Sequence, residues 1–345
     1  MRGLFVRDDP GAVTDCVTGY TWVFDATDRV LKCWDGSAWR HSCLTQYLVP
    51  VSDGNTFIAV PDGAGTAAQV LTSNGAGAYP SFQTAAVATW LSELTGLGLS
   101  HAVDTDHDIT IAVGAAASYH ATITSRVLLN LTAALTKQID AAWAVGTNQG
   151  GLFSGAVGTS TWYHVFLIRR SDTGVVDAGF DTSVTAANIP ASYDQYRRIG
   201  SVRTDGSANI LAFVQDGDLF QWSDPPLDIN VSNPGTAAVT RTLSVPTGVS
   251  VLALVNALAY DDTSAGGTPV VYLSDLAVTD EAASVSAGPL GQTAGGGTTV
   301  SPNPGQILVR ADTSAQIRSR ISASGATHRL RIATTGWIDS RGKNA

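Results

Sequence analysis

Short runs of strand-forming residues, separated by turn residues, fill the chain from about Leu97 to its C-terminus. Asp108–Gly114 alternates apolar and polar side chains, the period of a strand with one buried face. Trp162–Ile168 is apolar almost throughout, which indicates a central strand buried on both faces. Many short strands at regular spacing predict an all-β fold, with a large jelly-roll-like β-sandwich over residues 97–345. The other expected strands are Tyr196–Val202, Asn209–Gln215, Leu219–Trp222, Thr240–Val245, Ser250–Leu258, Pro269–Leu273, Gln306–Asp312, Ser314–Ser322 and His328–Thr334.

The composition agrees with a β-rich fold and narrows the range of partners. Of the 345 residues, 44% are hydrophobic, only 14% are charged and 35 are glycine. This profile suits small and β-branched strands joined by glycine-rich turns. The formal net charge of −9 argues against a nucleic-acid partner, which needs a concentrated basic face. The basic stretch from Arg318 to Arg341 alternates with apolar residues and predicts a sheet with one cationic face. No apolar run reaches the roughly 18 residues of a membrane helix, so no membrane insertion is expected.

The N-terminal residues 1–48 form a small aromatic-rich module. Trp22–Asp25 and Val30–Trp34 have strand composition, and the four residues between them predict a hairpin. Trp34 and Trp39 flank an Asp-Gly turn, which predicts a second reversal of the chain. A segment this small is not expected to be stable alone, so we expect it to dock onto a larger particle.

Residues 49–96 are interpreted as a connector, and their clearest feature is Gly65–Gln83, GTAAQVLTSNGAGAYPSFQ. Gln69–Thr72 predicts a strand, Ser73–Gly77 carries turn residues that accept a positive φ, and Tyr79–Gln83 resumes an extended run. A single strand–turn–strand unit cannot bury its own apolar side chains. It therefore needs a larger domain or further copies of itself as a packing partner.

Two segments have helical spacing. Val87, Trp90, Leu91 and Leu94 predict a short amphipathic helix within Ala85–Leu99. This helix could pack on the following domain, or three copies could meet around an axis. A second short helix is expected within Thr132–Val145, where Leu135, Ile139 and Ala142 form a stripe.

The three cysteines are Cys16, Cys33 and Cys43. An odd number without a signal peptide argues against a secreted disulfide scaffold and favours synthesis in a reducing cytoplasm. Cys33, His41 and Cys43 could share a zinc ion, but no paired CxxC knuckle is present. Buried free thiols are the favoured interpretation, and no metal or cofactor is expected.

The densest polar cluster contains His101, Asp104, Asp106, His107 and Asp108. Its Asp-x-Asp-x-Asp spacing imitates the first half of a calcium loop, in which alternate carboxylates converge on a hard cation. No glycine follows at the sixth position, and Ala115 stands where the closing acidic residue belongs. A polar turn that begins a strand is therefore preferred over a metal site at Asp104, Asp106 and Asp108.

No residue set predicts catalysis. Gly-x-Ser-x-Gly is absent from the sequence, and His164 lies within an aromatic strand, which favours a core or interface histidine. The carboxylates Asp172, Asp177, Asp181, Asp216 and Asp218 fall nearly all in turns, where they usually accept backbone hydrogen bonds. No long repeat indicates a β-helical depolymerase. We therefore expect no catalytic residues.

Two arginine doublets, Arg169-Arg170 and Arg197-Arg198, lie at or inside expected strands. The strand period directs the two side chains of a doublet to opposite faces. One member of each pair could be buried against a carboxylate such as Asp194 or reach a neighbouring subunit, and the alternative is a solvated outer face.

The connector sequence closely resembles the QVLTSNGAGAxPxFQ segments of bacteriophage tail-fibre and related virion fibre proteins. The runs DHDITIAVGAA, DAAWAVGTNQGGL, WYHVFLIRRSDTGVVDAGFDTS, IPASYDQYRRIGSV and LRIATTGWIDSRG resemble the C-terminal β domain of the same proteins. With the connector, the similarity covers most of the chain. It implies a homotrimeric structural protein of the virion, assembled in the host cytoplasm, whose N-terminal module contacts other virion proteins.

Two alternatives remain beside a purely structural fibre. The sandwich could be a receptor-binding domain for a host surface glycan, with candidate loops at Asn148–Thr161, Asp181–Ser192 and Tyr260–Thr268. These loops contain few aromatic residues for sugar stacking, namely Phe153 and Tyr260. A polysaccharide-degrading enzyme is the less favoured alternative, because no segment suggests a catalytic geometry.

Overall fold

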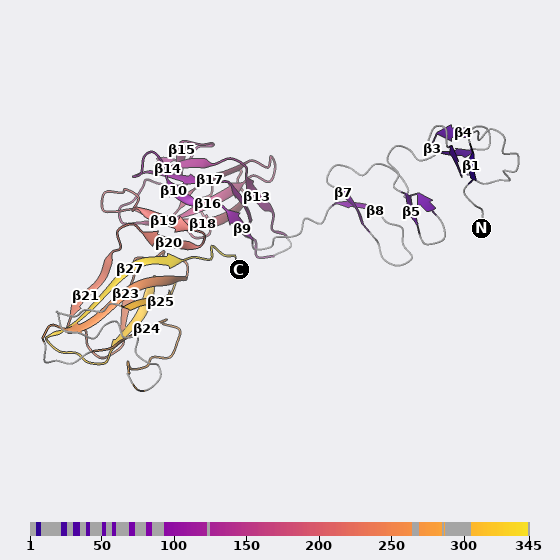
Figure 1. Cartoon of the computed structure of the whole chain (residues 1–345). Coiled ribbons are helices and arrows are strands. Elements are labelled where there is room, and N and C mark those ends of the chain that lie inside the picture. Colours follow the sequence, from indigo (N-terminus) through magenta and orange to yellow (C-terminus); the bar gives the residue numbers. More distant parts are fainter. Residues whose placement is uncertain are drawn as a thin grey trace. The chain divides into compact units, whose positions relative to one another are not determined.

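The computed structural model describes residues 93–343 apart from 123–124, 264–268, 285 and 287–304, together with the backbone of short strands in the first 84 residues. The chain divides into two compact units, Met1–Ala88 and Thr89–Ala345. Strands, turns and irregular loops make up nearly all of the described residues, and none of them lies in an α-helix. The all-β fold class predicted from the sequence is confirmed (Figure 1).

The described strands of the first unit form three small sheets. A four-stranded sheet has the order β1-β2-β3-β4, in which β1 runs parallel to β2 and the other pairs are antiparallel. Asp25 pairs with Val30 and Trp34 with Trp39, which confirms both predicted reversals of the chain. The other described strands form two antiparallel pairs, β5-β6 and β7-β8. The strands are β1 Phe5–Arg7, β2 Trp22–Asp25, β3 Val30–Trp34, β4 Trp39–His41, β5 Pro50–Ser52, β6 Phe57–Ala59, β7 Gln69–Thr72 and β8 Ser81–Thr84.

The predicted connector hairpin is present as β7 and β8. Thr72 pairs with Ser81 and Gln69 with Thr84, so the antiparallel ladder spans the two expected strand segments. The predicted turn residues Ser73–Gly77 and the three cysteines lie outside the described residues. Each strand contributes only four residues, and a two-stranded ribbon of this size is marginal in water without a packing partner.

The second unit begins with a seven-stranded mixed sheet of order β10-β11-β14-β15-β17-β16-β18 and a three-stranded sheet of order β13-β12-β9. In the larger sheet β14, β15 and β17 run parallel to one another, and the other neighbours are antiparallel. The strands are β9 Leu94–Gly96, β10 Leu99–His101, β11 Asp108–Ile111, β12 Gly114–Ala117, β13 Leu128–Leu131, β14 Leu135–Ala142, β15 Gln149–Leu152, β16 Trp162–Arg169, β17 Val176–Asp181 and β18 Gln195–Arg203.

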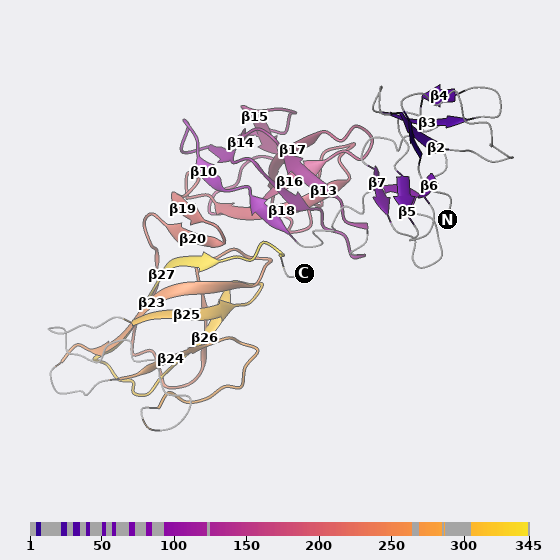
Figure 2. The same ribbon diagram turned by 45° about the vertical axis from the view of Figure 1, so that its right-hand side comes forward.

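The rest of this unit forms two further sheets (Figure 2). One has the order β19-β20-β27-β23-β25, with β21 also paired to β27, and the other has the order β22-β26-β24. The long strand β27 pairs with β20, β21 and β23, so it links the hairpin β19-β20 to the C-terminal strands. The strands are β19 Phe213–Asp216, β20 Leu219–Trp222, β21 Leu227–Ser232, β22 Val239–Thr242, β23 Val251–Asp261, β24 Val271–Ser274, β25 Gly305–Ala311, β26 Gln316–Ile321 and β27 His328–Ile338.

A large hydrophobic core runs through the described part of this unit, and a second, smaller cluster contains Phe166 and Ile168 of β16. Alternate residues of β23 and β25 face inward, among them Val255 and Val309, and they share the core with Ile317 of β26. On β16, six consecutive residues are buried, as predicted for a central strand, because β17 and β18 flank it and both faces are covered. Asp108–Ile111 alternates in burial, as its sequence pattern predicted.

Both helix predictions are wrong where the structure describes the residues. Leu94 belongs to strand β9, which pairs with β12, and Leu99 begins strand β10, whereas residues 85–92 lie outside the described part. Leu135 and Ile139 lie in strand β14. Residues four apart share a face in a strand as well as in a helix, so the two apolar side chains fit either period. Pairing with β11 decides the outcome for β14.

Candidate functional site

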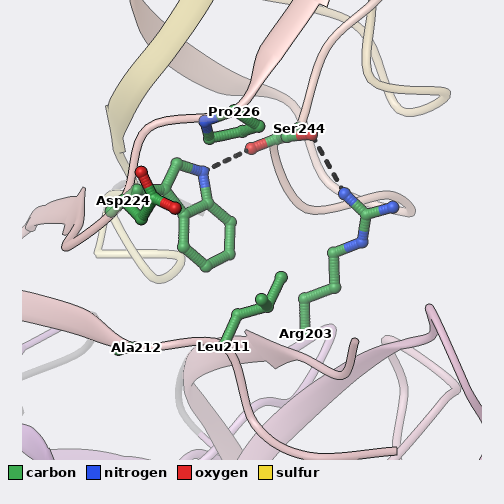
Figure 3. Close-up of a pocket in the computed structure, with 7 residues that line it drawn as sticks. Arg203, Leu211, Ala212, Asp224, Pro226 and Ser244 are labelled. Carbon is green, nitrogen blue, oxygen red and sulfur yellow. Dashed lines mark hydrogen bonds between the residues drawn. The ribbon is translucent and has the colours of Figure 1, made fainter. Parts of the chain in front are cut away.

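A cavity of about 230 Å³ lies where the end of β18 meets the hairpin β19-β20. Its lining residues come from four places in the sequence, and Figure 3 shows Arg203 and Asp224 on opposite sides with Leu211 below. Arg203 is the last residue of β18, and Leu211 precedes β19. The lining comprises Arg203, Leu211, Ala212, Trp222, Asp224, Pro226 and Ser244.

Ser244 fixes the geometry of the cavity. Its hydroxyl donates to Asp228 Oδ1 (2.7 Å), and its backbone N–H donates to Asp228 Oδ2 (2.8 Å). Because the Ser244 proton is committed to Asp228, its oxygen accepts a hydrogen bond from Arg203 Nη1 (3.0 Å). The carbonyl of Ser244 accepts from Trp222 Nε1 (3.0 Å). The cavity wall is therefore held by a connected polar network, and Trp222 is held in place by its own hydrogen bond.

Arg203 supplies the positive charge of the cavity. Its guanidinium carbon lies 5.9 Å from the ring centre of Trp162, a cation–π distance. Within the described residues, no carboxylate oxygen lies in ion-pair contact with Arg203. Leu211, Ala212 and Pro226 give the cavity apolar walls. The guanidinium lies beside apolar and indole surface, and the Asp224 carboxylate lies on the opposite side of the cavity. This arrangement suits a small ligand with a carboxylate at its Arg203 end and hydroxyl donors at its Asp224 end, such as an acidic sugar.

His164 is a core histidine, as its place in an aromatic strand predicted. It is 1% exposed, and its Nδ1 is 2.9 Å from the hydroxyl of Ser201, which is equally buried. Burial, with the nearby charge of Arg198, lowers the pKa of His164 to about 4. The Ser–His pair resembles part of a hydrolase triad in distance, but neither side chain lines the cavity or reaches solvent.

Arg198 is a doublet arginine whose carboxylate partner is buried. It makes a two-pronged ion pair with Asp339, with Nη1–Oδ2 at 2.6 Å and Nη2–Oδ1 at 2.7 Å. The partner differs from the suggested Asp194, which accepts hydrogen bonds from Ser171. Burial raises the pKa of Asp339, but the charge and hydrogen bonds of Arg198 outweigh it and leave that pKa below its usual value.

The other doublet arginines lie in different surroundings. Arg197 is 3% exposed, and burial together with nearby arginines lowers its pKa to about 10. Arg169 donates to Gln195, and Arg170 pairs with Asp172 at the surface. Arg197 pairs with Leu167 and Arg198 with Phe166, which are consecutive residues of β16, so the two arginine side chains point to opposite faces as expected, and the irregularity in the register lies beyond Arg198.

The acidic cluster forms the turn between β10 and β11. Asp104 accepts from the backbone N–H of Asp106 and from His107 Nδ1 (3.2 Å), and the His107 hydrogen bond lowers the pKa of Asp104. His101 Nδ1 lies 2.8 Å from the carbonyl of Thr105. Asp108 begins β11. Among the described residues, no group of His, Cys, Asp or Glu has the arrangement of a metal site.

The loops proposed for receptor binding present little aromatic surface. Phe153 stacks against Phe166 of the sheet, and Tyr260 is buried in β23 beneath the guanidinium of Arg331. The first loop contains β15, and part of the third, residues 264–268, is outside the described residues. The cavity residues Arg203, Trp222 and Ser244 did not emerge from the sequence. The Pro225-Pro226 pair after Trp222 is a local signal that the chain leaves the strand at this wall.

The basic stretch does not form a uniform cationic face. Arg318 and Arg320 share Asp280 as a carboxylate partner, and Arg329 pairs with Asp262. Arg341 is buried and donates to Asp218 in the β19-β20 turn. Acidic residues from loops therefore neutralise much of the charge that the sequence places on the strands.

Comparison with protein-family models and with curated protein sequences finds no match. No helix in the described part of the chain has the length and apolar character needed to cross a membrane.

Proposed function

We propose that the chain is a structural fibre or spike protein of a bacteriophage particle. Residues 1–48 attach it to other virion proteins, residues 49–96 act as a spacer, and residues 97–345 are displayed outward. The proposal is non-enzymatic and needs no cofactor. It rests on the connector hairpin, whose sequence carries the resemblance and whose two four-residue strands β7 and β8 pair with each other. A modular chain of small sheets before a large β-unit suits a spacer better than an enzyme core.

A homotrimer supplies the packing surface that the connector hairpin lacks. Sedimentation equilibrium of the full chain at micromolar concentration should therefore give three times the 35.7 kDa chain mass. Immunogold labelling of purified particles should place the protein on the virion. A monomer in sedimentation contradicts the trimer, and unlabelled particles contradict the virion assignment, so the two parts of the proposal fail separately.

Receptor recognition on the host surface is the second candidate, and the Arg203 cavity favours it. An acidic sugar could place its carboxylate at the guanidinium of Arg203 and its apolar face against the cavity wall. Loss of one charged hydrogen bond typically costs about tenfold or more in affinity.

The full chain should bind glycans with a carboxylate sugar on an array, and Arg203→Gln should weaken that binding about tenfold or more. Arg331→Gln is the matched control, because Arg331 lies over Tyr260 outside the cavity and its removal should leave binding unchanged. Binding of neutral glycans alone, or equal binding by both variants, excludes the Arg203 cavity as the recognition site.

A further inference from the structure

Lys137 and Asp177 form a buried pair that no step of the proposed function uses. Lys137 Nζ lies 2.8 Å from Asp177 Oδ1, and the side chains are 0% and 1% exposed. Few lysines and aspartates are buried to this degree, because removing two charges from water is costly even when they pair. The pair lies in the seven-stranded sheet, on β14 and β17, which flank β15 (Figure 1).

Glycines of β15 allow the two side chains to meet across the strand between them. A Cβ atom at Gly151 would lie 2.9 Å from the Cβ of Lys137 and 2.8 Å from the ring of Phe180. Any side chain at this position would therefore occupy the space that the Lys137 chain needs. The indole of Trp143 covers the amine, with Nζ 5.3 Å from the ring centre.

Backbone groups hold both the Lys137 amine and the Asp177 carboxylate in place. Lys137 Nζ donates to the carbonyl of Ala144 (2.6 Å). Asp177 Oδ2 accepts from Gly146 N–H (2.7 Å), and Oδ1 accepts from its neighbour Ala178 N–H (2.6 Å). The two N–H donors point at the carboxyl oxygens, where negative charge would gather if a nucleophile attacked the carbon.

We infer that Lys137 and Asp177 condense to an intramolecular isopeptide bond that joins β14 to β17. A proton first passes from the ammonium to the carboxylate, which gives a neutral amine and a neutral carboxylic acid. The Nζ lone pair then attacks Asp177 Cγ, and the tetrahedral intermediate is stabilised by the N–H groups of Gly146 and Ala178. One carboxyl oxygen leaves as water with one proton from nitrogen, so the step needs no oxidant, reductant or further reactant.

Three physical features favour this condensation. Burial lowers the pKa of Lys137, and the Asp177 interaction opposes but does not cancel this effect, so the neutral nucleophile is more accessible than in water. Fixed contact between the two groups replaces a bimolecular encounter, which corresponds to a very high effective concentration. The product is a neutral amide, so condensation removes two charges from an apolar site and releases water from it.

The mass of the full chain shows whether the isopeptide bond has formed. Under denaturing conditions, the wild-type protein should be lighter than its sequence by one water molecule. Proteolysis followed by tandem mass spectrometry should yield one branched peptide that joins Lys137 to Asp177. Wild-type protein at its full sequence mass, with no branched peptide, overturns the inference and leaves a buried ion pair.

Matched variants separate this bond from other losses of water, because Asp-Gly sites such as Asp205-Gly206 can also lose water by forming a succinimide. Lys137→Met should restore the full mass if the isopeptide forms, whereas a water loss that persists contradicts it. Asp177→Asn should lose ammonia in place of water. If either variant fails to fold, the branched peptide of the wild type still decides, because only the cross-link produces it.

Discussion

Replacing Asp339 by alanine should lower the free energy of unfolding by about 3–5 kcal/mol, the usual cost of removing one partner of a buried ion pair. Asp339 is 2% exposed, and both its oxygens accept from Arg198. It also accepts from the backbone N–H of Arg341 (2.8 Å). Arg198 and Arg341 lie close enough to Arg197 to lower its pKa, so Asp339→Ala leaves Arg198 without its carboxylate partner among neighbouring cations.

Chemical denaturation of the two proteins, monitored by tryptophan fluorescence, measures the difference. Trp337 lies two residues before Asp339 and is 1% exposed, so its emission should report the loss of this region. Asp172→Ala is the matched control, because the Arg170–Asp172 pair has a similar distance (2.6 Å) but lies at the surface. Its unfolding midpoint should stay at the wild-type value.

A double variant tests the physical cause. Arg198→Met combined with Asp339→Leu removes both charges and keeps apolar volume, so it should recover much of the stability lost in Asp339→Ala. If Asp339→Ala has the stability of the wild type, or if the double variant is no better than the single one, an uncompensated buried charge is not the reason for the loss.

Elements whose burial follows a local sequence pattern could be predicted, whereas those whose burial depends on a distant partner could not. Strand β16 was recognisable because a central strand is apolar on both faces, and β11 because one face alternates. Strand β14 was mistaken for a helix because Lys137 interrupts its inward-facing series between Leu135 and Ile139. The burial of Lys137 depends on Asp177, which lies forty positions later, and the sequence of β14 alone does not indicate that partner.

The candidate cavity likewise could not be predicted from local sequence. Arg203, Trp222 and Ser244 lie on separate segments, and each has an ordinary local context. Their meeting depends on how β18, the β19-β20 hairpin and the residues after β22 are brought together. The hairpin itself could be predicted, because Asp216-Gly217 is a turn sequence between two strand-forming segments. In the structure Gly217 adopts a positive φ of 59° between the paired residues Asp216 and Leu219. The pairing of that hairpin with β27 is a tertiary feature.

Acidification should destabilise the protein through His164 before most carboxylates titrate. The folded-state pKa of His164 is about 4, against an ordinary value of 6.5. Because the folded-state pKa is depressed, the unfolded chain binds the proton more tightly, and stability is lost as pH falls from 6.5 towards 4. This single group should cost about 2 kcal/mol by pH 5 and about 3 kcal/mol by pH 4.

The surroundings of His164 explain why its pKa is lowered in the folded protein. Burial and the positive charge of Arg198 disfavour the imidazolium, whereas Asp339, Asp181 and a backbone hydrogen bond with Thr247 favour it without reversing the shift. Denaturant unfolding at a series of pH values measures the effect. His164→Gln should flatten the profile between pH 6.5 and 4, and His120→Gln, which alters an exposed histidine, should retain it.

Carboxylates cannot produce the same window. A carboxylate with a lowered pKa, such as Asp339, loses its contribution only as the pH nears or falls below its unfolded value of 3.8. A loss that begins near pH 6 therefore identifies the histidine, because the wild type should take up close to one proton on unfolding near pH 5. A profile that is flat down to pH 4.5 in the wild type rules out a buried neutral His164. Asp339→Ala should also deepen the acid sensitivity, because it removes a carboxylate that stabilises the protonated His164 ring. It leaves in place the positive charge of Arg198, which contacts the Ser201 hydroxyl beside that ring.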